Sequence, residues 1–233
     1  AMVGCTLGQA WPEASSLVLP VGTDRQLRIG DMGGKILLIE PGGVLPKKHH
    51  LLVGLDDGRS LVVAIQGWGG MWLGKLGDPP PFGRDGRTRL VDPVSDEFSY
   101  ERFKDLVAKD AGMERKRSVK AFMASEPRIA GVGNGYVQDI CFRARLHPRR
   151  ELSSLTGREH QRWYRAIRGV LTDAIDQGGR DTEVDLFGAP GGYVAQMDRR
   201  AKGQPCPSCG TPIEKISYLG GSCYVCPECQ ALE

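Results

Sequence analysis

The chain has 233 residues, enough for one large domain or for two modest domains with a small appended segment. Its 40% hydrophobic and 25% charged residues are ordinary for a soluble globular protein. No apolar run approaches the roughly 18 residues of a membrane span, which excludes a helical membrane protein, and a net charge of +3 is too small to identify a partner. The opening residues Ala1–Cys5 lack the regions of a signal peptide, so we expect a cytoplasmic protein.

The N-terminal part of the chain has the alternating apolar pattern of β-strands. The predicted strands cover 26–29, 35–40, 51–55 and 61–65. The Asp57-Gly58 pair between the last two strands is typical of a hairpin turn. A stretch with three consecutive prolines, from 78 to 86, predicts a loop or linker. We therefore expect a β-rich N-terminal domain over residues 1–94.

From about residue 95 the spacing of apolar residues becomes helical. Ser99 and Ser118 each precede a short apolar stripe and are predicted N-caps of the first two helices. A third helix is predicted over 135–146. The fourth is the best marked, because the segment 156–159 (Thr-Gly-Arg-Glu) has the capping-box pattern. Its buried stripe is predicted to contain Trp163, Ile167, Val170, Leu171, Ala174 and Ile175. We expect a helical domain over residues 95–200.

A glycine turn lies between the second and third helices. Gly131 and Gly133 bracket it, and Asn134 follows. Glycine lets the backbone approach a ligand closely, so the amides here and the Asn134 side chain can face a phosphate. Alone the turn is a weak signal, because glycine turns before helices are common.

Positive charge surrounds this turn in the sequence. Eight arginines lie between residues 143 and 168 against two glutamates, and a second basic cluster spans 115–120. Such clusters suit contacts with a phosphate backbone. A solvated helix face gives the same pattern and is the alternative.

The C-terminal tail carries two knuckles of the same Cys-Pro-x-Cys pattern, separated by sixteen residues. Their cysteines are Cys206, Cys209, Cys226 and Cys229. Four thiolates delivered by two tight turns suit one structural Zn²⁺ in a closed tetrahedral site. Two disulfides or free cysteines are the alternative, and Cys223 could compete as a ligand. Cysteines used for metal favour a reducing cytoplasm. We expect a zinc-finger hairpin over residues 201–233.

Seven motifs, taken together and in their order along the chain, resemble the C-terminal half of the formamidopyrimidine-DNA glycosylase and endonuclease VIII family. The motifs are Lys120, the Ile-Ala-Gly-Val-Gly-Asn segment 129–134, Ala144–Pro148, the capped helix, Gly178-Gly179, Asp185–Gly192 and the finger ending in Cys-Gln. The resemblance implies an α+β fold, with a partial N-terminal β-sandwich, a helix–two-turn–helix DNA-binding domain and a C-terminal zinc-finger hairpin. It also implies a monomer that binds double-stranded DNA containing a lesion or an abasic site, in a bacterial cytoplasm and on the nucleoid when bound.

The resemblance assigns DNA-binding residues by position. Asn134 matches the family's phosphate-binding asparagine and Lys120 matches its lysine, with Gly131 and Gly133 in the intervening turn. In the N-terminal half the match is poorer. His49, with Lys48 beside it, stands where the family has a DNA-contacting lysine. Trp68 stands at the strand end whose apolar side chain fills the gap left by an everted base, although a residue buried in a β-sandwich is an equal alternative.

The family's chemistry is less well matched than its scaffold. Family members attack the sugar with an N-terminal proline amine, and an adjacent glutamate shuttles protons. This chain begins Ala1-Met2-Val3, and its early Pro12-Glu13 pair is internal, so the proline nitrogen is an amide. Gly221 stands where the family's finger carries an arginine. Two hypotheses follow. The first is a DNA glycosylase and AP lyase of base-excision repair, or a chain derived from one that has lost its start, so that the N-terminal domain is truncated or divergent. The second is a non-catalytic homologue that recognises bent, nicked or abasic DNA.

Overall fold

The computed structural model describes residues 2–13, 16–30, 33–67, 69–79 and 90–232. It divides into two compact units, which we describe separately. The first unit consists of Ala1–Arg89 with Thr182–Gly191, and the second of Leu90–Asp181 with Gly192–Glu233. The C-terminal hairpin thus belongs with the helices, and 182–191 belongs with the strands. The predicted boundaries at 94 and 200 stay a prediction.

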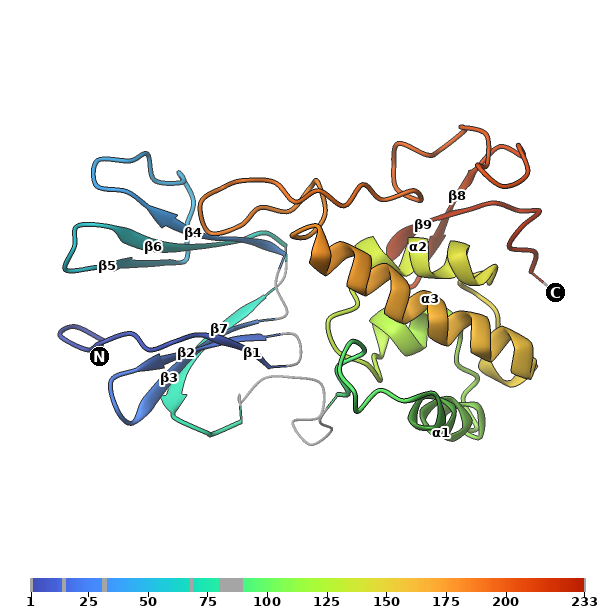
Figure 1. Cartoon of the computed structure of the whole chain (residues 1–233), viewed down its shortest axis with the longest axis horizontal. Helices are drawn as coiled ribbons and strands as arrows, with labels where there is room; N and C mark the ends of the chain where they lie inside the picture. Colours follow the sequence, from blue (N-terminus) through green and yellow to red (C-terminus); the bar gives the residue numbers. More distant parts are fainter. Residues whose placement is uncertain (1, 14–15, 31–32, 68, 80–89, 233) are drawn as a thin grey trace. The chain divides into compact units, whose positions relative to one another are not determined.

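The first unit contains two antiparallel sheets (Figure 1). One has the strand order β1-β2-β3-β7, with β1 Trp11–Glu13, β2 Ser16–Val21, β3 Arg25–Gly30 and β7 Gly70–Lys75. The other has the order β4-β6-β5, with β4 Gly34–Ile39, β5 Leu51–Gly54 and β6 Ser60–Ile65. The four predicted strands correspond to β3, β4, β5 and β6. The sequence pattern missed β1, β2 and β7, because Pro20 interrupts β2 and glycines interrupt β7.

Alternate side chains of both sheets share one apolar core. Residues two apart point to the same face of a strand. The core of the unit contains Leu19, Val21, Leu27, Ile29, Leu61 and Val63, which come from β2, β3 and β6. The two sheets therefore form the expected sandwich.

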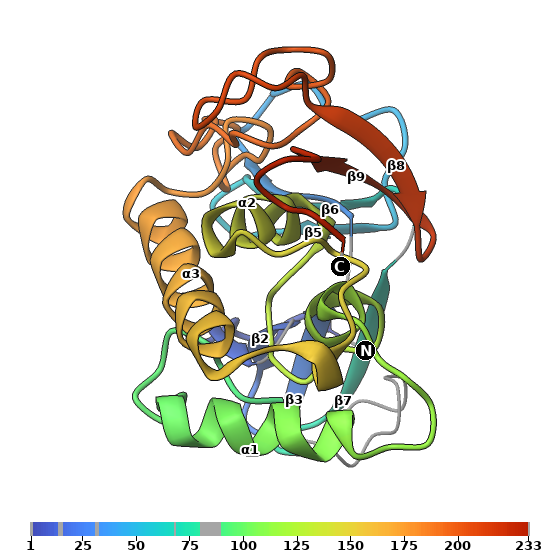
Figure 2. The same cartoon turned by 90° about the vertical axis from the view of Figure 1, so that its right-hand side faces the viewer.

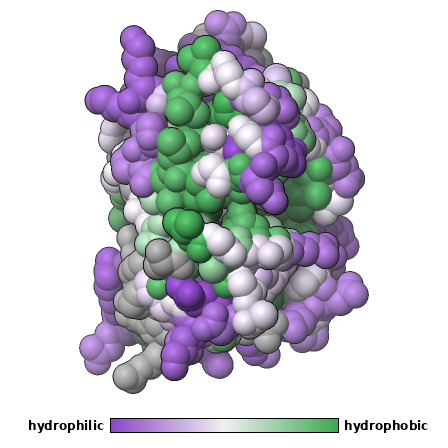
Figure 3. Space-filling model, turned by 90° about the vertical axis from the view of Figure 1, so that its left-hand side faces the viewer, coloured by the Kyte–Doolittle hydropathy of each residue, from purple (hydrophilic) through white to green (hydrophobic). Residues whose placement is uncertain are grey.

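Some apolar side chains of the first unit stay outside this core. Val3 and Val44 are almost fully exposed, and Leu52 is 44% exposed. Figure 3 shows apolar surface among hydrophilic residues on one face of the molecule. Exposed apolar residues are normal on folded proteins, so these three carry no functional argument.

The second unit packs three α-helices, two short helical turns and a β-hairpin around one core. Its elements are α1 Tyr100–Ala111, η1 Ala121–Ser125, α2 Asn134–Ala144, η2 Leu152–Ser154, α3 Gly157–Asp176, β8 Glu214–Tyr218 and β9 Gly221–Val225. Figure 2 shows α2 between α3 and the β8–β9 hairpin. Trp163 of α3 is fully buried, and its ring meets those of Phe103 and Phe122 edge-on, with 5.1 Å between centroids in each pair. Trp163 is a core residue, as predicted.

Helix ends lie close to where the sequence places them. Ser99 accepts a hydrogen bond from the Arg102 amide at 3.1 Å. The capping box is complete, since the Glu159 amide donates to Thr156 Oγ1 and the Thr156 amide to Glu159 Oε2. The third helix runs from Asn134 to Ala144 rather than over 135–146, because Arg145 takes the left-handed conformation with φ 53°.

Two local predictions differ from the structure. The second helix is a five-residue π-helical turn, η1, although Ser118 accepts a hydrogen bond from the Ala121 amide as expected of a cap. Pro127 follows closely and disfavours helical backbone in the residue before it. Ile175, predicted in the buried stripe, is 61% exposed. It lies at the margin of the stripe, one residue past Ala174, and the helix ends directly after it. Among the described residues, no helix has the length and apolar composition needed to cross a bilayer.

The chain after α3 is tied to α2 by one buried carboxyl group. Asp139 is 1% exposed and accepts three hydrogen bonds: from the Tyr193 hydroxyl at 2.7 Å, the Met197 amide at 2.8 Å and the Gln196 amide at 3.1 Å. Burial, and then the bond to Asp139, raise the pKa of Tyr193 above its ordinary range. Asp139 therefore fixes the segment that leads to the C-terminal hairpin.

Replacing Asp139 with alanine should destabilise the second unit strongly, because the buried Met197 amide and Tyr193 hydroxyl, together with the Gln196 amide, lose their acceptor. An unsatisfied buried group costs about 1–3 kcal/mol, so we expect a loss of about 3 kcal/mol or more in the free energy of unfolding, measured by urea denaturation. Asp173→Ala is the matched control, since Asp173 is 45% exposed in its pair with Arg143 and should cost about 1 kcal/mol or less. Equal losses would contradict the role of Asp139.

Candidate nucleic-acid interface and metal centre

The structure brings the four predicted cysteines together. Their Sγ atoms all lie within 4.8 Å of one another. Cys209 and Cys226 are 3.4 Å apart, and Cys206 and Cys229 are 3.9 Å apart. A tetrahedral metal with bonds of about 2.3 Å, as zinc forms to thiolates, requires sulfur atoms about 3.8 Å apart. The cluster therefore fits a four-coordinate metal site.

The turns around the cysteines suit thiolate ligands. The Ser208 amide donates to Cys206 Sγ at 3.4 Å, and the Cys229 amide donates to Cys226 Sγ at 3.3 Å. Hydrogen bonding by Thr211 lowers the pKa of the Cys209 thiol to about 6, whereas burial raises the pKa values of Cys226 and Cys229. A metal bound by these cysteines would favour their thiolate forms, so binding it would release protons.

Cys223 lies outside this cluster. It is fully buried, and its Sγ is 3.5 Å from Lys120 Nζ. The alternative ligand Cys223 is therefore excluded from the cluster, which contains the preferred Cys226 and Cys229. Successive residues of β9 point to opposite faces, and Cys223 faces the helices.

Lys120 occupies an unusual position for a cation. Its side chain is 0% exposed, and its Nζ donates to the Tyr218 carbonyl of the hairpin at 2.6 Å. Its own amide donates to the Pro148 carbonyl, which fixes the start of η1. A buried ammonium group is costly unless it finds acceptors or an anion.

The N-terminus of α2 approaches the same hairpin. Gly131 has φ 70°, a conformation that favours glycine, and it turns the chain into the helix. Gly133 is the extended N-cap residue, and no side chain of the described residues caps the helix. Asn134 is exposed at the first helical position. Backbone amides of the first turn therefore remain available to an anion, which the helix dipole also favours.

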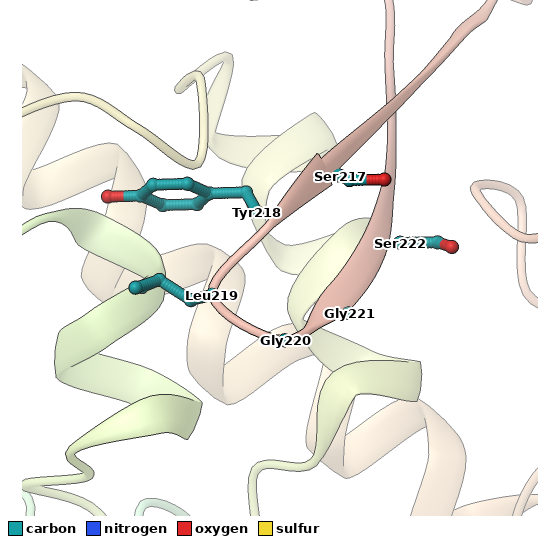
Figure 4. Close-up of a pocket in the computed structure, with 6 residues that line it drawn as sticks. All are labelled: Ser217, Tyr218, Leu219, Gly220, Gly221 and Ser222. Carbon is teal, nitrogen blue, oxygen red and sulfur yellow. The ribbon is translucent and has the colours of Figure 1, made fainter.

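Gly221 is the point where these groups meet. A Cβ at Gly221 would lie 3.3 Å from both Lys120 Nζ and Asn134 Nδ2. The end of the hairpin forms an open pocket of about 450 Å³ lined by Ser217–Ser222. Figure 4 shows that Tyr218 and Leu219 project to one side of the hairpin end, and Ser217 and Ser222 to the other. Lys120, Asn134 and the hairpin thus form one site with amide and ammonium donors.

Two arginines lie beside this site: Arg149, which belongs to the basic cluster at 143–168, and Arg180, which sequence reasoning missed. Arg149 donates to the Ser217 carbonyl at 3.1 Å, and its guanidinium carbon lies 5.3 Å from the centre of the Tyr218 ring. Arg180 lies 5.1 Å from the Tyr136 ring centre, and a Cβ at Gly135 would collide with it at 1.9 Å. The many arginines between residues 143 and 168 were the sequence signal for Arg149. Gly135, directly after Asn134, was the sequence signal for Arg180, because a side chain at this position would collide with it.

The second basic cluster of the sequence is largely neutralised. Arg117 is buried and pairs with Asp110 at 2.7 Å. Arg115 pairs with Glu126 and Lys116 with Glu151, both at 2.9 Å. In this cluster Lys120 is the cation that reaches the hairpin.

The remaining predicted DNA contacts belong to the first unit. Lys48 and His49 are both exposed in the loop before β5, and His49 Nδ1 lies 3.1 Å from the Pro46 carbonyl. Trp68 lies outside the described residues.

Comparison with known proteins gives the family. Residues 90–185 match the model of the formamidopyrimidine-DNA glycosylase H2TH domain. A formamidopyrimidine-DNA glycosylase of Roseiflexus sp. is 34% identical over 218 residues, which cover 83% of this chain and 70% of that protein. The chain belongs to the formamidopyrimidine-DNA glycosylase family. The enzyme of the same name from Symbiobacterium thermophilum is also 34% identical, over 85% of this chain and 65% of its own length.

Solved structures of family members share the fold. A Lactococcus lactis structure, described as a complex between Fpg and DNA containing an abasic site, matches with a TM-score of 0.84 at 24% identity, covering 98% of this chain and 83% of that one. A structure of MutM in complex with DNA containing carbocyclic 8-oxo-G matches with a TM-score of 0.85 at 23% identity, covering 99% and 84%. The expected sandwich, helical module and C-terminal hairpin are therefore confirmed as the architecture of this family.

A buried histidine next to Arg149 should make the second unit acid-sensitive. His147 is 7% exposed, and its Nδ1 accepts a hydrogen bond from the Arg149 amide at 3.1 Å. Burial, and then the Arg149 charge, lower the pKa of His147. The unfolded chain, with a histidine pKa of about 6.5, therefore binds more protons than the folded one as pH falls through that value. The free energy of unfolding should decrease below about pH 6.5, and His147 should not reduce it above that pH.

Chemical denaturation at pH 7.5 and 5.5 measures this effect. His147→Asn should reduce the stability lost between the two pH values, whereas the exposed-site control His49→Gln should lose as much as the unsubstituted chain. His160, whose pKa burial also lowers, accounts for part of what remains. A His147→Asn profile parallel to that of the unsubstituted chain would contradict the assignment.

Proposed function

We propose that this chain acts in base-excision DNA repair by binding duplex DNA that contains a lesion or an abasic site. The observation that carries the proposal is that the Lys120 ammonium and the Asn134 amide, at the uncapped N-terminus of α2, both approach Gly221 at the end of the hairpin. Family membership and the solved relatives, which hold abasic or damaged DNA, support it.

The donors suit a phosphate of the DNA backbone. Asn134 and the first amides of α2 are hydrogen-bond donors at the positive end of a helix dipole. Lys120 adds a full charge beneath the hairpin, while its bond to the Tyr218 carbonyl holds that hairpin in place. Arg149 and Arg180 extend the positive surface. Contacts of this kind position a protein on DNA and read no sequence.

Asn134→Ala and Lys120→Ala should each weaken binding to an abasic-site duplex across sequences. Asn134→Ala removes a hydrogen bond to a charged phosphate, which is worth about 1.5–3 kcal/mol, and should lose about tenfold to a hundredfold in affinity. Lys120→Ala should lose a similar factor, because the buried ammonium group no longer holds the hairpin through the Tyr218 carbonyl. Fluorescence anisotropy with two unrelated duplex sequences measures the loss. Lys109→Ala, an exposed lysine at the end of α1, is the matched control. Unchanged affinity in both site variants would refute the assignment.

The family's glycosylase and lyase reaction is one form of this function, and binding without cleavage is the other. The described residues supply binding groups, and we assign none of them to the chemical steps. Borohydride trapping on abasic-site duplex DNA separates the two. A covalent adduct assigns lyase chemistry to the chain and excludes the binding-only hypothesis. Binding without adduct or strand cleavage excludes catalysis by this chain.

We infer that the four-cysteine cluster holds one structural Zn²⁺. Its spacing matches four zinc–thiolate bonds, and all four positions are protein ligands, which leaves no coordination position for chemistry. The metal would fix the two knuckles that carry β8 and β9. Lys48, His49 and Trp68 stay predicted DNA contacts of the first unit. A monomeric state and a cytoplasmic location, on the nucleoid when DNA is bound, also stay predictions.

Removing the metal should unfold the C-terminal hairpin and abolish tight DNA binding, while α1 and α3 remain folded around Trp163. Structural zinc supplies folding free energy to segments too small to fold alone. Metal analysis should give one zinc per chain, and a chelator should remove it together with the protection of amides in 201–232 from hydrogen exchange. Cys209→Ser should behave similarly, and Cys223→Ser should keep its zinc. Tight binding that survives complete zinc removal would overturn the inference.

A further inference from the structure

A second cluster of positive charge lies where the C-terminal end of α2 meets the middle of α3. Arg143 from α2 and Arg162 and Arg165 from α3 line a concave surface of about 280 Å³, together with Ala166. We call these four residues the arginine pocket. Arg143 follows Asn134 by nine residues, about 14 Å along the α2 axis. The arginine pocket is therefore separate from the Lys120–Asn134 site.

Two of its three guanidinium groups are held by the unit itself. Arg143 Nη2 lies 2.6 Å from Asp173 Oδ2. Gly169 of α3 leaves room for Arg143, because a Cβ there would approach its Nη1 at 3.4 Å. Arg162 donates from Nε to the Ala144 carbonyl at 3.2 Å, which is one of the carbonyls that a helix end leaves without an internal partner. Both arginines keep other N–H donors for a ligand, and side chains already held in place lose less freedom when they bind one.

The arginine pocket carries excess positive charge. Asp173 compensates one of the three cations. Within the described part of the chain, Arg165 makes neither an ion pair nor a hydrogen bond. Arg158, Arg162 and Arg165 are spaced four and three residues apart and so share one face of α3. Converging like charges are unfavourable until an anion binds between them.

The residues that line the arginine pocket favour a phosphate group over the acidic surface of a protein as the bound anion. A guanidinium fork matches phosphate oxygens with two parallel hydrogen bonds. Ala166 is the apolar member of the lining, whereas interfaces with proteins bury larger apolar or aromatic anchors. We propose that the arginine pocket is a second contact for the phosphate backbone of nucleic acid, independent of base sequence and of the Lys120–Asn134 site. Through this contact the second unit binds a segment of DNA additional to the segment at the hairpin.

The test is the salt dependence of binding to undamaged duplex DNA by the full chain. Arg165→Gln removes a charge without removing an internal contact, so it should leave the fold intact. Each phosphate contact contributes about 0.9 to the slope of log K against log salt concentration, so the slope should fall by about 0.9 in Arg165→Gln and about 1.8 in the double variant Arg162→Gln/Arg165→Gln. The matched controls are Arg102→Gln and Arg102→Gln/Lys109→Gln, which remove exposed charges from α1. Their slopes should equal that of the unsubstituted chain.

Independence from the first site is tested in an Asn134→Ala background, where the same decrease in slope should appear because separate sites act additively. A decrease that vanishes in this background would overturn independence. Slopes equal to those of the controls would overturn the proposal altogether, and the function proposed above would still stand on the Asn134 and Lys120 variants. Binding of a poly-glutamate peptide that Arg162→Gln/Arg165→Gln abolishes, with the DNA slopes unchanged, would assign the arginine pocket to an acidic protein instead.

Discussion

The buried ammonium of Lys120 is the interaction on which the second unit's site depends. Removing a charge from water is costly, and here the Tyr218 carbonyl offsets part of that cost at 2.6 Å. This contact requires η1 and the hairpin to hold a fixed relative position. Other bonds secure the same position: Gln138 of α2 donates to the Ser222 carbonyl, and Gln230 bridges the Cys226 amide and the Leu146 carbonyl. The hairpin, the metal cluster and α2 are therefore held together, with the buried Lys120 ammonium between η1 and the hairpin.

Two glycines make room for this assembly. At Gly221 any side chain would crowd Lys120 and Asn134, and at Gly135 it would collide with Arg180. The absent side chains bring an ammonium, an amide and a guanidinium close to the backbone of α2 and the hairpin. Gly221 occupies the position at which the family carries an arginine. The end of the hairpin is an open pocket, and Arg149 donates a hydrogen bond to the Ser217 carbonyl beside it.

Ion pairing, rather than the number of basic residues, decides which cations of this protein remain available to DNA. The sequence contains two basic clusters that look equally suited to DNA. In the structure, Asp110, Glu126 and Glu151 neutralise most of the cluster at 115–120. The cluster at 143–168 divides between the hairpin, which Arg149 contacts, and the arginine pocket. Carboxylates distant in sequence decide which cations remain available. The number of basic residues in each cluster therefore could not show which of the two clusters is available to DNA.

Features that depend on neighbouring residues can be predicted from the amino-acid sequence alone. The capping box at Thr156, the Asp57-Gly58 hairpin, the strands with uninterrupted alternation and the paired cysteine knuckles each depend on residues a few positions apart. The Ile-Ala-Gly-Val-Gly-Asn turn is also local, and it indicated the family together with the other motifs in their order along the chain. Only the tertiary structure decided that Lys120 is buried, that Cys223 faces it rather than the metal cluster, and that three arginines from two helices converge. These depend on contacts between residues 18 to 103 positions apart in the chain, such as Arg162 with Ala144 and Lys120 with Cys223, and no local pattern records such distances.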